Sequence, residues 1–117
     1  MYLYEAELIG ANLYEADLIG ANLSKAKLNR VNFGKANLCK INLSRADLGG
    51  ADLTEALLAE ANLNRAELMG ANLSKADLSG ASLIQATLIG ANISRATLSR
   101  ADLHGVNLYV GVGDRSR

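Results

Sequence analysis

The residues best suited to chemistry are few and far apart in this chain of 117 residues. It contains one cysteine, Cys39, and one histidine, His104. A Cys/His nucleophilic pair needs the two side chains within hydrogen-bond reach, and a zinc site needs several such ligands. The sequence therefore predicts neither a cysteine nucleophile nor a zinc site. A single cysteine also excludes an intramolecular disulfide, and we expect Cys39 to be a partly exposed, chemically ordinary thiol.

Carboxylates and glycines are the remaining candidates for a catalytic or phosphate-binding role. The 12 Asp and Glu residues are interspersed with 12 Lys and Arg residues, and an exposed surface lacks the burial that tunes catalytic carboxylates. Glycine recurs at positions 10, 20, 50, 70, 80 and 90 without forming a GxGxxG or GxxxxGK[ST] phosphate loop. We therefore expect no enzyme activity, no cofactor, no metal and no small-molecule substrate.

The overall charge and composition exclude further classes of protein. Because the formal net charge is zero, no field of the whole molecule attracts nucleic acid or an anionic membrane. Half of the residues are apolar, only 4% are aromatic and proline is absent, which indicates a packed aliphatic core. Residues 1–5 lack the basic start of a signal peptide, and no apolar stretch approaches the roughly 20 residues of a membrane span. We expect a soluble, cytoplasmic protein with no nucleic-acid or membrane partner.

A repeat of five residues runs through almost the whole chain. Its third position is Leu in twenty of twenty-two blocks, its first is Ala in eighteen, and its second is Asn or Asp in fourteen. The blocks cover residues 1–110 as one repeat domain and leave residues 111–117 as a short tail.

A period of five matches neither an α-helix nor a continuous strand. On a helix, five residues advance by about 140° beyond whole turns, so successive leucines would spread around the cylinder. In a strand, an odd period sends successive leucines to opposite faces. The chain must therefore turn once per block and wind into a solenoid with Ala and Leu inside.

The tandem A(D/N)LXX blocks resemble the pentapeptide repeat family. The resemblance implies an all-β fold, a right-handed quadrilateral parallel β-helix with four blocks per coil, hence about five and a half coils here. Family members commonly carry end caps, whereas this chain has no obvious capping helix. The turn types at the corners stay open, because glycine occupies only some of the bends.

Residues twenty apart should lie above one another on the outside of this β-helix. Several columns then alternate in charge, such as Glu15, Lys35 and Glu55, which favours pairing between coils to fix their register. Residues 1–20 carry a charge of −4 and residues 21–40 carry +5, so a banded docking surface is the alternative. The candidate interaction surface is Lys25, Lys27, Arg30, Lys35 and Lys40.

The stacked Asn and Asp residues at the second position should have a structural role. They form ladders such as Asn12, Asn32, Asp52, Asn72 and Asn92, whose side chains can satisfy backbone groups of the turns or one another.

The ends of a solenoid expose core leucines and unpaired strand edges unless something covers them. We expect end-to-end self-association through Tyr2, Tyr4 and Tyr14 at one end, or through Tyr109, Val110 and Val112 at the other. The alternatives are that Met1 and the tail fold over the ends, or that the chain is a piece of a longer protein.

Two functions follow from the family resemblance. Its best-understood members are quinolone-resistance proteins, whose rods resemble duplex DNA in shape and negative charge and bind DNA gyrase. The zero net charge and the basic second coil disfavour that function here, and the projecting loop of several such proteins is missing. Many other members, abundant in cyanobacteria, are small non-enzymatic proteins of unassigned role. We therefore expect a structural or protein–protein interaction module, with gyrase binding as the alternative.

Overall fold

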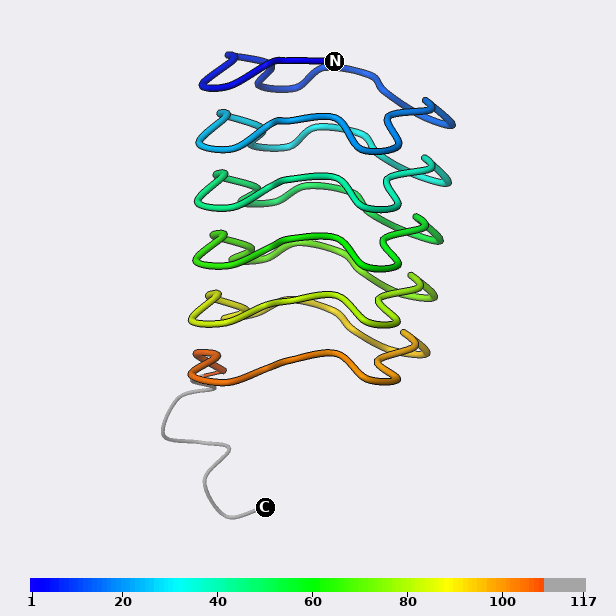
Figure 1. The fold of residues 1–117 in the computed structure, drawn as a ribbon, viewed down its shortest axis with the longest axis vertical. Helices are drawn as coiled ribbons and strands as arrows, with labels where there is room; N and C mark the ends of the chain where they lie inside the picture. The colour runs from blue at the N-terminus through cyan, green and yellow to red at the C-terminus, as the bar shows by residue number, and fades with distance from the viewer. Residues whose placement is uncertain (109–117) are drawn as a thin grey trace.

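The chain winds into a stack of nearly identical coils, with its N-terminus at one end of the stack (Figure 1). The structure is a computed structural model, and it describes residues 1–108. Within that range there is no helix, and each side of a coil contributes a single residue to a parallel ladder. The ladders join residues twenty apart, from Tyr2 with Asn22 to Thr87 with Asn107. The fold is the expected right-handed quadrilateral β-helix, with a coil of twenty residues.

Backbone hydrogen bonds tie each block to the coils on both sides. In the block that begins at Ile41, the Asn42 N–H donates to the Ala21 carbonyl of the preceding coil at 2.9 Å. The N–H groups of Leu43 and Arg45 donate to carbonyls of the following coil, at 2.7 and 2.9 Å. The same scheme recurs from block to block along the stack. Proline would remove one of these donors, which accounts for its absence from the repeat.

Every described corner is built as the same type of turn. The first N–H of each block donates to the third carbonyl of the block before it, as Ala46 does to Leu43 at 3.0 Å. Only the fifth residue of each block has positive φ, at fourteen non-glycine and seven glycine positions. A single positive φ at the third residue of a four-residue turn defines type II. The structure thus settles the turn type that the sequence left open.

The core consists of the first and third residues of the blocks. From Leu18 to Leu88 all of these side chains are buried, and Phe33 fits among the leucines with no exposed surface. No polar or charged side chain is buried within residues 1–108. Candidate binding sites must therefore lie on the outer faces or at the ends of the stack.

Candidate interaction surfaces

The side chains that could act as a nucleophile or bind a metal do not come together in the fold. Cys39 is half-buried at a corner of the second coil, as expected, and His104 is exposed on the last described coil. Residues 1–108 contain no group of three or more His, Cys, Asp or Glu side chains placed to hold a metal ion. In the same part of the chain no helix has the length and apolar character needed to cross a membrane.

The Asn and Asp side chains at the second position hold the corner backbone. In thirteen described blocks the Oδ1 atom of this residue accepts a hydrogen bond from the N–H of the fourth residue. Asn42, for example, accepts from the Ser44 N–H at 3.0 Å and from the Ser44 hydroxyl at 2.7 Å. This satisfies the one donor of the block that neither the ladder nor the turn engages. The structural interpretation of the ladders is confirmed.

The second coil carries a belt of five exposed cations, which we call the basic belt. Four of them occupy the fifth positions at the four corners of the coil, and the remaining one lies on a face between corners. Residues 21–40 include no carboxylate. The members of the basic belt are Lys25, Lys27, Arg30, Lys35 and Lys40.

Two lysines of the basic belt lie against tyrosines of the first coil. The Lys25 ammonium lies 5.7 Å from the centroid of the Tyr4 ring, within the range of a cation–π contact. The pKa of Lys35 is raised above 10.5, first by its interaction with the Tyr14 phenol and then by Glu55 and Glu15. The column of Glu15, Lys35 and Glu55 is therefore electrostatically coupled, as the twenty-residue spacing predicts.

The cations of the basic belt differ in what lies above and below them. Carboxylates occupy the adjacent coils next to Lys27, which lies in the ladder between Glu7 and Asp47. Arg30 instead shares its column with Gly10 and Gly50, and a Cβ atom added at Gly50 would lie 3.2 Å from the Arg30 Cγ. Carboxylates in the adjacent coils thus flank Lys27 and Lys35, whereas Arg30 has none in its column on either side.

The first coil has a large apolar side chain at each of its four corners, and we call these side chains the N-terminal rim. The exposed fractions of the rim residues are 38% for Tyr4, 51% for Ile9, 47% for Tyr14 and 54% for Ile19. The Tyr2 and Tyr4 rings stack, with centroids 6.2 Å apart. Sequence reasoning identified the tyrosines but missed the isoleucines. The signal was available, because all four residues occupy the fourth position of their blocks.

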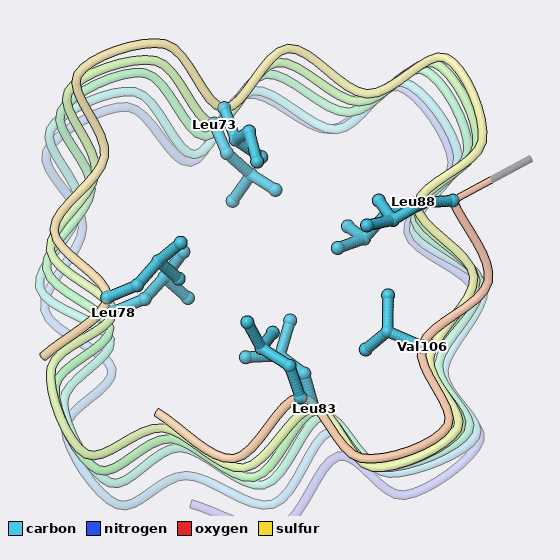
Figure 2. Close-up of a pocket in the computed structure, with 9 residues that line it drawn as sticks. Leu73, Leu78, Leu83, Leu88 and Val106 are labelled. Carbon is cyan, nitrogen blue, oxygen red and sulfur yellow. The ribbon is translucent and has the colours of Figure 1, made fainter. Parts of the chain in front are cut away.

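The other end of the described stack is also apolar. A cavity of about 30 Å³ lies on the axis there, and Figure 2 shows Leu73, Leu78, Leu83, Leu88 and Val106 projecting into the square section. Three core-type side chains of this end are partly open, with exposed fractions of 36% for Ile93, 40% for Leu103 and 53% for Leu108. Tyr109, Val110 and Val112, which sequence reasoning placed at this end, lie outside the described residues.

A family model and several solved structures resemble the chain. The model described as "Pentapeptide repeats" matches residues 6–45, 36–75, 46–83 and 76–109. No match was found among curated proteins.

The similar structures include Rfr23, a pentapeptide repeat protein from the cyanobacterium Cyanothece 51142, at 36% identity and a TM-score of 0.75. That match covers 75% of this chain and 60% of Rfr23. A pentapeptide repeat protein from the Arabidopsis thaliana thylakoid lumen is 29% identical with a TM-score of 0.75, and the match covers 86% of this chain and 72% of that protein.

The chain is also similar to a trypsin-treated form of QnrB1, a plasmid-mediated fluoroquinolone resistance protein. The identity is 26% and the TM-score 0.66, and the match covers 90% of this chain and 58% of QnrB1. The chain thus spans about three fifths of the length of Rfr23 and of QnrB1.

Proposed function

The chain belongs to the pentapeptide repeat family, and from this membership we propose that it is a non-enzymatic module that binds an acidic protein surface through the basic belt. The observation that carries the proposal is a coil with a cation at all four corners and no carboxylate of its own. The core of this coil is filled by buried side chains, so the contact surface is its outside.

Within the basic belt, Arg30 and Lys25 are the residues expected to contribute most to binding. Arg30 lies between two glycines. Lys25 has Glu5 in its column on the preceding coil and Arg45, a second cation, on the following coil, so its single carboxylate neighbour is offset by another positive charge. Neighbouring carboxylates compensate Lys27 and Lys35, which therefore serve mainly the register of the coils. An exposed charge with no opposite charge beside it attracts an acidic partner over a distance of about 8 Å at physiological salt.

Affinity capture from extracts of the native cell tests the proposal with two matched variants. The belt variant carries Lys25→Glu and Arg30→Glu, and the control carries Arg65→Glu and Lys75→Glu. All four residues are exposed, non-glycine and at positive φ, so both variants change charge equally and leave the corner backbone the same. We expect a captured partner to be lost with the belt variant, retained with the control and released by added salt. A partner captured equally by both variants would exclude the basic belt as its binding site.

The second candidate function is binding to DNA gyrase, as implied by the likeness to the quinolone-resistance proteins. The similarity to QnrB1 favours it, and the basic belt opposes it because five cations interrupt a phosphate-like negative surface. We therefore expect an excess of the protein to leave the supercoiling activity of gyrase unchanged. Inhibition of supercoiling, or protection of the enzyme from a quinolone, would make this the better function.

A further inference from the structure

We propose that the protein stacks head to tail with a second copy of itself, the C-terminal end of one copy docking on the N-terminal end of the next. This contact is separate from the basic belt and does not depend on the proposed function.

Both ends of the described stack present side chains that are buried elsewhere in the repeat. Leu3, Leu8 and Leu13 are only partly buried, whereas the third-position leucines of the interior coils have almost no exposed surface. The N-terminal rim adds four exposed apolar side chains around these leucines. At the opposite end Ile93, Leu103 and Leu108 are exposed and line the axial cavity. Contact between the two ends would continue the core across the junction.

The backbone edges at the two ends complement each other. At the N-terminal end, the N–H groups of Glu7, Asn12 and Asp17 have no backbone acceptor among the described residues. At the C-terminal end, the carbonyls of Ala91, Ala96 and Ala101 accept no backbone hydrogen bond from residues 1–108. Inside the stack, second-position N–H groups donate to first-position carbonyls of the preceding coil, so a head-to-tail junction would repeat an existing set of bonds.

Charge favours the head-to-tail arrangement over two like ends in contact. The first coil carries Glu5, Glu7, Glu15 and Asp17 and no basic side chain, so two N-terminal ends would repel each other. Arg95 and Arg100 are exposed at two corners of the last described coil. Besides the exposed His104, residues 81–108 contain no other basic side chain. Asp102 is the one carboxylate of residues 81–108, so this end is net basic and matches the acidic end better than another copy of the acidic end does.

The corners bring opposite charges together in every possible register of the junction. Glu5 and Glu15 occupy opposite corners of the square coil, and Gly10 and Gly20 occupy the other two. Arg95 and Arg100 occupy adjacent corners. Since the square section allows four quarter-turn orientations, each of them places one of the two glutamates over one of the two arginines. In the corner column of Lys35, Glu55 and Glu15 add to the raised pKa of this lysine after the larger effect of Tyr14, as expected for opposite charges stacked on adjacent coils.

Two alternative ways of covering the ends lead to different expected masses in solution. Residues 109–117 of the same chain would cover only the C-terminal end, and the protein would then stay monomeric. Contact between two like ends would be symmetric and would stop at the dimer, whereas a head-to-tail contact does not close and extends into longer stacks.

The test is the mass of the full chain in solution, measured by light scattering and sedimentation velocity over a range of concentrations. We expect the average mass to rise past the dimer as concentration increases. One variant carries Glu5→Arg and Glu15→Arg, and the other carries Arg95→Glu and Arg100→Glu. The association constant of each variant alone should be at least tenfold lower than that of the unchanged chain. An equimolar mixture of the two should associate again, because opposite charges face each other at every junction.

Controls separate this contact from general charge effects and from misfolding. The pair Arg65→Glu and Lys75→Glu, on the sides of the stack, should leave association unchanged, and circular dichroism should show the same fold for all variants. A mass that stops at the dimer, or variants that associate as well as the unchanged chain, would overturn the proposal. Association that appears only after removal of residues 109–117 would also overturn it and assign the C-terminal end to those residues.

Discussion

The ring of Tyr14 lies directly over Gly34, which occupies the equivalent corner of the next coil. A Cβ atom added at Gly34 would be 2.9 Å from Tyr14 Cδ1 and 3.1 Å from Tyr14 Cε1, closer than such contacts normally allow. Gly34 is buried, although its position in the block is exposed or half-buried in every other coil. The missing side chain at Gly34 is therefore what lets the first coil pack its tyrosine onto the second.

We predict that Gly34→Ala lowers the free energy of unfolding by about 1 kcal/mol, because the Tyr14 ring must leave its place. The φ angle of Gly34 lies outside the left-handed region, so the backbone itself accepts alanine. Urea unfolding measures the effect. In a Tyr14→Ala background the same substitution should be nearly neutral, and equal effects in both backgrounds would show that the two residues are not coupled.

Removal of a second-position acceptor should weaken the fold locally. Asn42→Ala leaves the Ser44 N–H without the Oδ1 partner that it has at 3.0 Å, and we expect a loss of about 1 kcal/mol. Asn42→Asp keeps the acceptor and should be close to neutral. The control is Glu67→Ala, because the Glu67 side chain makes no such hydrogen bond in the described structure. If Asn42→Ala is as mild as the control, the side-chain contact contributes little to stability.

At a corner with positive φ, replacing glycine by alanine should lower stability even where the added methyl group meets no other atom. Gly70 has φ of +69°, and an added Cβ atom would meet no atom within 4 Å. Gly70→Ala should therefore cost about 1 kcal/mol through the backbone alone, as expected for an L-residue in the left-handed region. At Lys75, with φ of 61°, the reverse change Lys75→Gly should not destabilise the protein. Thermal unfolding of the two variants checks both, and loss of stability in Lys75→Gly would assign a packing role to its side chain.

Stability should decline in acid partly through Asp77. The Ser79 hydroxyl at 2.6 Å and the Ser79 N–H at 3.0 Å both donate to its carboxylate and lower the pKa of Asp77 below 3.8. Because the pKa of Asp77 is lower in the folded than in the unfolded chain, its carboxylate stabilises the fold fully at pH values above the unfolded-state pKa. This stabilisation is lost as the pH falls through the folded-state pKa. The affected window is thus below about pH 4.

Titration of the Asp77 carboxyl by NMR measures this effect. Ser79→Ala should raise the pKa of Asp77 toward its ordinary value. Asp77→Asn keeps an acceptor but does not titrate, so its unfolding curves should depend less on pH than those of the unchanged chain. An Asp77 pKa that Ser79→Ala leaves unmoved would contradict the assignment of the shift to Ser79.

The fold was predictable because its signal is repeated in nearly every block. The Leu and Ala positions alone required a turn every five residues. The coil of twenty was implied only by the resemblance to the pentapeptide repeat family, and the structure confirms it. The turn type was not predictable, because Lys75 and Gly70 adopt the same left-handed conformation although only glycine favours it. The ladder bonds on both sides of each corner override the local preference of the residue.

The candidate surfaces were predictable only in part. A coil of twenty residues puts the five cations on one coil, and Glu55 and Glu15 contribute to the raised pKa of Lys35 after Tyr14. That this coil is an interaction surface stays a prediction. The isoleucines of the N-terminal rim were not predicted, because Ile9 or Ile19 alone gives no signal. The apolar rim emerges only when the four corners of the first coil are compared. The different surroundings of Arg30 and Lys27 likewise emerge only from comparison with the coils above and below.

Phe33 favours the correct register of the coils during folding. Because most blocks carry the same Ala and Leu, a chain that skipped one coil during folding would still bury nearly the same side chains. Such a slip would place Phe33 at the level of Leu13 or Leu53, in a section shaped for a smaller residue. One fully buried ring among aliphatic neighbours thus penalises misthreaded intermediates, which a perfectly uniform repeat would tolerate.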